Sequence, residues 1–517
     1  MARIRALDDT APRAIEGPWQ LLTTPPGACA GPGDLDAAGD WIPAEVPGTA
    51  AAALRAAGRW CEAMPAPLHD SDIWYRTRLA GTGRERLRFE GLATLCEIWL
   101  DGVPVRASDS MFRACTIEVD LTGASDLVLC FRSLTAALAR PHKRGRWRPR
   151  LATPGSLKGF RTSLLGFMPG WSPEIHLVGP YRPATREPAA PGPVEADLRA
   201  SLDGTTGRLA VRLRLPGQRA VIRCAGREIT LTSSEPGLHV GELILPDIDP
   251  WWPHTHGEPR LHAVEAEVDG RRYACGRVGF RSLTLTRPFE EGLSLAVNSV
   301  PVFCRGACWT PADLVGLSGT RETLSPLLDL AREAGVNMLR VPGITLYEAD
   351  AFHDLCDELG ILVWQDLMLA NFDYPHDDPE FREHLTAEIA DLLDRTQTSP
   401  SLAIVCGGSE VWQQAAMLGL PREAWSGGFP AEALPGLVAE RRPDLITVPN
   451  SPSGGDLPFS VRAGATHYFG VGAYLRPFED ARRAEVGFAS ECLAFANVPE
   501  PESLRRAALT DPTDPRW

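Results

Sequence analysis

At 517 residues the chain is too long for one hydrophobic core, so we expect about three domains. Its 44% hydrophobic and 23% charged residues are typical of globular proteins, and its net charge of −14 argues against nucleic acid as a partner. We find no apolar run of membrane-spanning length, which is about 18 residues, and no secretory signal at the N-terminus. The twelve scattered cysteines favour free, buried thiols over disulfides. We therefore expect a cytoplasmic protein without a membrane partner.

Residues 1–183 carry β signals and are expected to form a jelly-roll sandwich. The segment LRFEGL at 87–92 alternates between apolar and polar residues. In CEIWLDGVPV, Asp101-Gly102 lies between two strand-like runs, which indicates a hairpin. Many short strands at irregular spacing are typical of this architecture.

A basic loop at 139–150, ARPHKRGRWRPR, follows these strands. It carries Arg or Lys at six positions. It is either a solvated loop or a rim that attracts an anionic sugar or phosphate.

Residues 184–286 are expected to form an immunoglobulin-like β-sandwich after a Pro-rich linker. RLAVRLRL at 208–215 alternates without error. The pair His254 and His256 in PWWPHTHGEP has no third ligand in view, so a turn is favoured over a metal site.

From residue 287 onward the pattern changes to alternating strands and helices. Helical spacing predicts helices at 321–334, 350–359 and 380–396. Apolar runs predict seven strands, at 301–307, 337–341, 361–366, 401–410, 445–450, 465–469 and 485–491. Repeated βα units of this length favour a (β/α)8, or TIM, barrel over 287–517.

Two glutamates follow barrel strands. Glu410 ends the fourth predicted strand, SLAIVCGGSE, and Glu491 ends the seventh, EVGFASE. The C-terminal ends of barrel strands carry catalytic groups. Two carboxylates there are what cleavage of a glycosidic bond requires.

The barrel motifs carry a family resemblance. They are NSVPVFCRGACWTPAD, NMLRVPG, YEADAFHDLCDELGILVWQD, the SE after strand four, HYFG and FASE. The N-terminal half agrees through IPAEVPG, GLATLCEIWLDG, DSMF, GPYRP and WWP…GEPRL…GFR. From about Trp19 to Glu491 the chain resembles glycoside hydrolase family two, nearest its β-mannosidase-like subgroup.

The resemblance implies hydrolysis of β-glycosides with retention of configuration, without a metal or cofactor. It places Glu410 on the acid/base, with a pKa raised by a drier site and the nearby anion, and Glu491 on the nucleophile. Arg340 would hold Glu491 charged. The other residues that match positions near the family's sugar pocket are Asp366, Ser409, His467, Tyr468, Trp309 and Trp171.

Three positions depart from the family's pattern. Ser409 replaces the asparagine before the acid/base, which bonds the sugar 2-hydroxyl, and this loss could cost several kcal/mol. Gly170 stands where the β-mannosidase loop has a sugar-binding aspartate, which puts mannose specificity in doubt. Cys308 replaces another asparagine.

The leading hypothesis is a retaining exo-β-glycosidase of altered sugar specificity. A catalytically weak or inactive carbohydrate-binding descendant is the alternative, supported by Ser409 and Gly170. A transglycosidase is a third reading that sequence does not separate from a hydrolase.

The end of the chain leaves little material for barrel closure. After Glu491 only 517 − 491 = 26 residues remain, with a short helical piece at 502–509 and no apolar run for an eighth strand. We expect seven barrel strands and a gap between the first and the seventh, exposing apolar surface near Phe303 and Phe488. The sequence thus predicts a truncated chain or a partner chain that completes the barrel.

Overall fold

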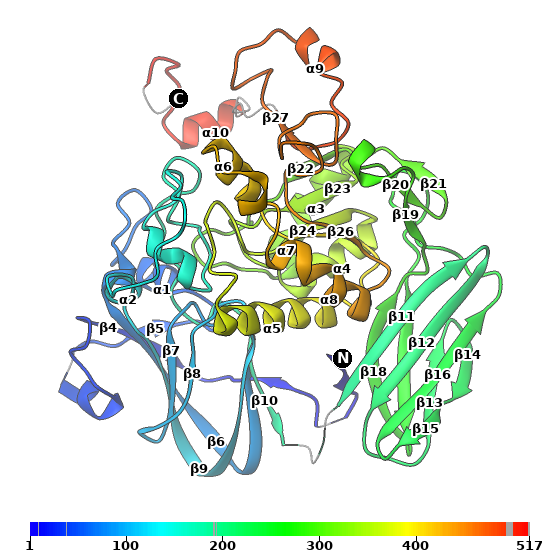
Figure 1. The fold of residues 1–517 in the computed structure, drawn as a ribbon. Coiled ribbons are helices and arrows are strands. Elements are labelled where there is room, and N and C mark those ends of the chain that lie inside the picture. Colours follow the sequence, from blue (N-terminus) through cyan, green and yellow to red (C-terminus); the bar gives the residue numbers. More distant parts are fainter. Residues whose placement is uncertain (9, 38, 190–191, 193, 493–499, 515–517) are drawn as a thin grey trace.

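The computed structural model describes residues 1–8, 10–37, 39–189, 192, 194–492 and 500–514. The protein has several domains and is mostly β with interspersed helices (Figure 1). Among the described residues, no helix is long and apolar enough to cross a membrane.

The first body is an eight-stranded sheet built around one long antiparallel pair (Figure 1). Its strands are β3 (Arg13–Ala14), β4 (Trp19–Thr24), β5 (Ile42–Ala44), β6 (Asp72–Phe89), β7 (Cys96–Leu100), β8 (Val103–Ser108), β9 (Cys115–Phe131) and β10 (Ala184–Pro188). Strands β6 and β9 pair along their whole length, from Ile73 with Phe131 to Phe89 with Cys115. Helices α1 (Ala50–Ala56) and α2 (Leu134–Leu138) lie in its connections.

The second body packs two five-stranded antiparallel sheets over a shared apolar core. One sheet holds β1 (Ala2–Arg3), β11 (Glu195–Asp203), β12 (Thr206–Arg214), β16 (Leu238–Leu245) and β15 (Thr232–Glu235). The other holds β14 (Arg227–Thr230), β13 (Ala220–Cys224), β17 (His262–Val268), β18 (Arg271–Val278) and β2 (Arg5–Ala6). The first six residues of the chain therefore add strands to this second body, not to the sheet that follows them in sequence.

A short antiparallel sheet precedes the parallel strands of the third body. It contains β19 (Leu283–Leu285), β20 (Leu295–Val297) and β21 (Val300–Val302). The prediction of a barrel strand over 301–307 was wrong, because Asn298 and Ser299 adopt positive φ and turn the chain back into a hairpin. The first parallel strand is instead β22 (Gly306–Cys308).

Among the residues that the structure describes, this body has seven parallel strands, divided between two sheets. The first sheet runs in the order β22, β23 (Met338–Val341), β24 (Leu362–Asp366), β25 (Leu402–Cys406) and β26 (Ile446–Val448). The second pairs β27 (Thr466–Tyr468) with β28 (Ala489–Cys492). Within the described residues β22 pairs only with β23 and β28 only with β27, so closure of a barrel is not observed.

The helices that the structure describes in the third body are α3 (Arg321–Glu333), α4 (Asp350–Leu359), α5 (Pro379–Arg395), α6 (Val411–Met417), α7 (Phe429–Glu432), α8 (Leu434–Arg441), α9 (Glu479–Arg483) and α10 (Pro501–Arg506). Four of them, α3, α4, α5 and α10, lie close to the predicted ranges, whereas α6 to α9 were not predicted. Gly360 ends α4 in the left-handed conformation, as expected for a C-terminal glycine. The tail at 493–499, where no eighth strand was predicted, lies outside the described residues.

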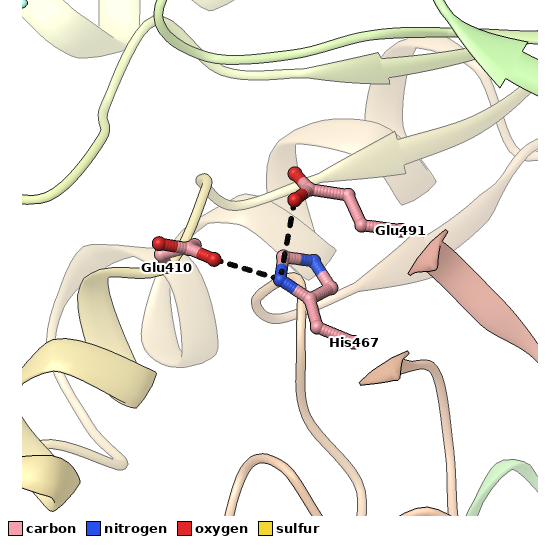
Figure 2. Close-up of side chains that lie close together, drawn as sticks. All are labelled: Glu410, His467 and Glu491. Carbon is pink, nitrogen blue, oxygen red and sulfur yellow. Dashed lines mark hydrogen bonds and ion pairs between the residues drawn. The ribbon is translucent and has the colours of Figure 1, made fainter. Parts of the chain in front are cut away.

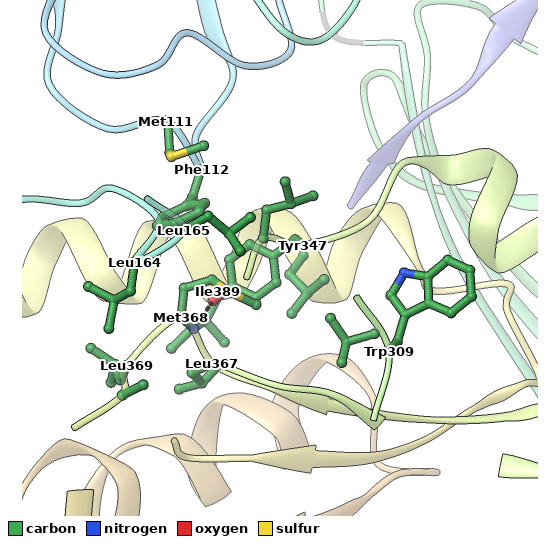
Figure 3. Packing of buried hydrophobic residues seen from close by; sticks show 14 of the residues in the cluster. Met111, Phe112, Leu164, Leu165, Trp309, Tyr347, Leu367, Met368, Leu369 and Ile389 are labelled. Carbon is green, nitrogen blue, oxygen red and sulfur yellow. Dashed lines mark hydrogen bonds between the residues drawn. The ribbon is translucent and has the colours of Figure 1, made fainter. Parts of the chain in front are cut away.

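The first body is fixed to the third by a shared apolar cluster (Figure 3). Met111, Phe112 and Leu164 pack beside Tyr347 and Ile389. Within this interface the buried Arg161 guanidinium makes two hydrogen bonds to the Glu388 carboxylate on α5, at 2.9 and 2.6 Å. This buried ion pair therefore joins the first body directly to α5 of the third.

The basic loop at 139–150 lies against the third body. Arg146 bonds the carboxylate of Asp373 through its side chain and its backbone N–H. The loop also lines a cavity of about 290 Å³ with Trp147, Trp412 and Trp425. At least one cation of this loop, Arg146, is thus paired with a carboxylate of the third body.

Candidate active site

Glu410 lies four residues beyond strand β25, not at the strand end that the sequence predicted. The strand finishes at Cys406, and Glu410 precedes α6 with φ 54° and ψ 9°. This left-handed conformation is unusual for a residue with a side chain, and such strain is concentrated at functional sites. The site therefore holds Glu410 in a conformation that its residue type disfavours.

Glu491 lies within β28, next to β27 in the parallel sheet. Its register partner on β27 is His467. The carboxylate of Glu491 accepts a hydrogen bond of 2.5 Å from Nη1 of Arg340 on β23. Arg340 thus contacts the carboxylate of Glu491, which the sequence assigned as the nucleophile.

His467 brings the two glutamates together (Figure 2). Its Nδ1 lies 2.8 Å from Oε1 of Glu410 and 3.6 Å from Oε2 of Glu491. One carboxylate oxygen of each glutamate lies within 4.8 Å of the other. This separation is near the roughly 5–5.5 Å of retaining glycosidases and below the roughly 6.5–9.5 Å of inverting ones.

The charge state of Glu410 differs from the expectation for a general acid. Burial alone raises the pKa of Glu410, but the hydrogen bond from His467 and its charge outweigh burial and lower the pKa below 4.5. Gln414 also donates to this carboxylate, at 3.2 Å. The sequence predicted a raised pKa because it did not place His467 in contact with Glu410.

Ser409 and Asp366 lie behind the glutamates, in a buried network around Arg340. Nη2 of Arg340 donates to Oδ2 of Asp366 at 2.7 Å and to Oγ of Ser409 at 3.0 Å. Ser409 donates to the same Asp366 oxygen at 2.5 Å and accepts from the N–H of Gly343 at 2.9 Å. Both side chains are therefore used within the protein, and Asp366 is fully buried.

The aromatic residues named from the sequence separate into two groups. Trp171 and Trp309 line a cavity of about 580 Å³ that also reaches Arg340 and Glu491. Trp171 is 60% exposed, whereas Trp309 is buried and donates through Nε1 to Glu348. Tyr468 does not line this cavity; its hydroxyl donates to Asp480 at 2.7 Å.

Sequence reasoning missed several residues of the site. Gln413 donates to Glu410 at 2.9 Å, and Ser451 bonds Nε2 of His467 at 3.1 Å. The glutamines could have been found, because positions three and four after Glu410 share its face of a helix. Ser451 comes from a loop after β26 and has no signal of that kind.

Comparisons with known proteins agree with the family resemblance. A family profile described as "Glycosyl hydrolase 2 galactose-binding domain-like" matches residues 33–182. The chain is 26% identical over 423 residues to Beta-mannosidase B of Aspergillus terreus, covering 74% of the chain and 50% of the relative. It is 29% identical over 440 residues to Beta-mannosidase B of Aspergillus niger, covering 76% and 51%. The chain thus spans about half the length of the curated relatives it matches.

Solved structures share the fold. The β-D-mannosidase of Dictyoglomus thermophilum superposes with a TM-score of 0.79 at 24% identity, covering 96% of this chain and 64% of that one. The exo-chitosanase of Amycolatopsis orientalis gives 0.65 at 18% identity, covering 96% and 59%.

In fold and in sequence, the chain is thus similar to glycoside hydrolases. Within that class, the resemblance to glycoside hydrolase family two and its β-mannosidases is confirmed.

Proposed function

We propose that this chain is a retaining exo-β-glycosidase that releases terminal β-linked sugars by double displacement. The observation that carries the proposal is the placement of Glu410 and Glu491, whose carboxylate oxygens approach within 4.8 Å beside a cavity of about 580 Å³. The architecture we propose is a jelly roll over 1–183, an immunoglobulin-like sandwich over 184–286 and a (β/α)8 barrel over 287–517.

In the proposed first step, Glu491 attacks the anomeric carbon and Glu410 protonates the leaving oxygen. Arg340 is buried and donates to Glu491, so it holds the attacking carboxylate in place. Water then attacks the glycosyl-enzyme while Glu410 takes up its proton. The sugar would lie against Trp171 and Trp309 in the cavity, where aromatic faces stack on apolar sugar faces.

The sugar itself is proposed to differ from mannose. Gly170 offers no side chain at the position where the β-mannosidase loop has an aspartate. Ser409 is 3% exposed and bound to Asp366 and Arg340, so its hydroxyl is not free for a sugar hydroxyl. Both features weaken contacts that the family resemblance implies.

A catalytically weak carbohydrate-binding protein is the second candidate. The lowered pKa of Glu410 favours it, because a general acid must carry a proton when the sugar binds. The free thiols of all twelve cysteines support a cytoplasmic location for either candidate.

A screen of nitrophenyl β-glycosides on the purified chain separates the two candidates. We expect turnover of at least one sugar, lost in Glu491→Ala and partly restored by azide as a product of inverted configuration. Glu440→Ala, on the exposed face of α8, is the matched control and should keep full activity. Binding of sugars without turnover of any glycoside would support the second candidate.

A further inference from the structure

The side chains of Glu410, His467 and Glu491 bring three possible metal-binding atoms close together (Figure 2). Nδ1 of His467 faces Oε1 of Glu410 at 2.8 Å and Oε2 of Glu491 at 3.6 Å. All three donor atoms lie within 4.8 Å of one another. The glutamate side chains are 14% and 21% exposed, whereas that of His467 is fully buried.

Hydroxyl groups behind the His467 ring indicate that its Nε2 carries a proton. Oγ of Ser490 donates to the carbonyl of Thr466 at 3.2 Å, and a carbonyl oxygen can only accept. Ser451 therefore donates to Ser490, at 2.7 Å, and accepts from Nε2–H of His467, at 3.1 Å. Nδ1 donates to the carboxylate of Glu410, so a metal ion bound at Nδ1 would displace that proton and leave Nε2–H on Ser451.

Around these three side chains, negative charges outnumber the positive charge of Arg340. Arg340 is the cation in contact with the cluster, and its two ion pairs are to Glu491 and Asp366. Three carboxylates, those of Glu410, Glu491 and Asp366, thus face one guanidinium.

We propose that Glu410, His467 and Glu491 bind one Zn²⁺ ion or a similar borderline divalent transition-metal ion. One imidazole nitrogen and two carboxylate oxygens are ligands that Zn²⁺ accepts, and it leaves a fourth position for water. Metal–ligand bonds of about 2.1 Å place tetrahedral donors about 3.5 Å apart, so the carboxylates need to move by roughly 1 Å. Their partial exposure allows this movement.

The supporting groups suit a metal ligand. A ligating histidine ordinarily donates its other ring N–H to a fixed acceptor, which here is Ser451. The cavity of about 580 Å³ that reaches Glu491 gives the ion a path from solvent. Binding does not depend on glycosidase activity. Inhibition is its consequence if the chain is active, because the ion occupies both carboxylates.

Calorimetric titration of the full chain with ZnCl₂ tests the proposal. We expect one ion per chain, bound at least tenfold more weakly by His467→Gln. Glu491→Gln, which keeps the size of the side chain, should weaken binding comparably and serves if His467→Gln does not fold. His256→Gln is the control, because that ring lies in the turn after β16 and bonds Thr255. Unchanged affinity in both site variants would overturn the proposal.

Co²⁺ absorption distinguishes this site from the thiols of the same cavity, Cys304, Cys308 and Cys492. We expect ligand-field bands of nitrogen and oxygen ligands that are lost in His467→Gln. An intense thiolate-to-Co²⁺ charge-transfer band that persists in this variant would assign the ion to cysteine and contradict the proposal.

Discussion

Single residues of the site were indicated where a carboxylate or an arginine lies near the end of a strand. Glu410, Glu491 and Arg340 meet as the motifs indicated. The protonation of Glu410 was not predictable, because it depends on the orientation of the His467 ring. Hydrogen bonds across long sequence separations decide such pKa shifts, and spacing along the chain carries no record of them.

The pH dependence of catalysis should expose the effect of His467 on Glu410. Because the pKa of Glu410 is lowered, its protonated fraction falls above that pKa, and the rate on alkyl glycosides should fall up to about tenfold per pH unit. His467→Phe removes the two largest causes of lowering and leaves burial, Gln414 and Arg340, so the pKa of Glu410 rises and the fall in rate should begin at a higher pH. Activated aryl glycosides need little protonation and should show little change.

The control for this measurement is Tyr468→Phe, which removes only the bond to Asp480. It should not change the pH at which the rate on alkyl glycosides begins to fall. The role of Glu410 as acid would be contradicted if His467→Phe left this pH unchanged. It would also be contradicted if Glu410→Ala lost equal activity on alkyl and aryl glycosides.

Ser409→Asn should not restore a family-like activity. The serine hydroxyl occupies a buried position between Asp366, Arg340 and the N–H of Gly343. A larger side chain there overpacks the network, at a cost of about 1–3 kcal/mol. We expect a lower melting temperature and a lower kcat/KM, measured by calorimetry and by steady-state kinetics. A more active variant of unchanged stability would show instead that this side chain reaches the sugar.

At the scale of elements, the bounds of the predicted helices were accurate, although α6 to α9 were not predicted. α4 was predicted at the observed residues, Asp350–Leu359, because an apolar stripe and a terminal glycine mark it. The first strand was misplaced, because an apolar run does not distinguish a hairpin from a buried parallel strand. The seventh strand begins four residues later than predicted, at Ala489.

Helix α4 carries a buried histidine that should make the fold sensitive to acid. His353 is 4% exposed, and neither ring nitrogen has a hydrogen-bond partner within the described residues. Burial lowers its pKa from 6.5 to about 3. The unfolded chain therefore binds a proton first, so stability is complete above about pH 6.5 and falls by up to about 1.4 kcal/mol per pH unit toward pH 3.

Replacing this ring should reduce the loss. We expect His353→Leu to flatten the fall in melting temperature between about pH 6.5 and pH 4. The fall should not disappear, because burial also lowers the pKa of His69 to about 3 and that of His376 to about 4. His142→Leu, an exposed position in the basic loop, is the control. If the melting temperatures of His353→Leu and of the unmodified chain fell equally with pH, this account would be refuted.

At the scale of the whole molecule, a chain of several bodies was predictable from length and from the change of period near residue 287. Their attachment was not. Residues 2–6 form strands two residues long in the second body, and such short strands have no pattern. The Arg161–Glu388 pair joins residues 227 positions apart. Only the folded chain brings these partners together.

Two strand edges of the third body, those of β22 and β28, give the last prediction. Strands β22 and β28 both line the cavity of about 580 Å³, and no described strand joins them. Phe303, beside β22, is 80% exposed, as expected, whereas Phe488 is only partly exposed and stacks on Trp364. Free edges next to exposed apolar surface recruit other strands. We therefore propose that a further polypeptide strand, from a C-terminal extension or a partner chain, completes this body.

Without such a strand, the 517-residue chain should self-associate through this surface. Light scattering after gel filtration should give a concentration-dependent mass above that of the 56.1 kDa monomer. Phe303→Lys should reduce association, because it places a charge beside the open edge. Leu475→Lys changes a side chain that is 90% exposed on the loop before α9, away from the lining of this cavity, and should have a smaller effect. An active monomer at all concentrations would show that the edges are protected as they stand, and that no further strand is needed.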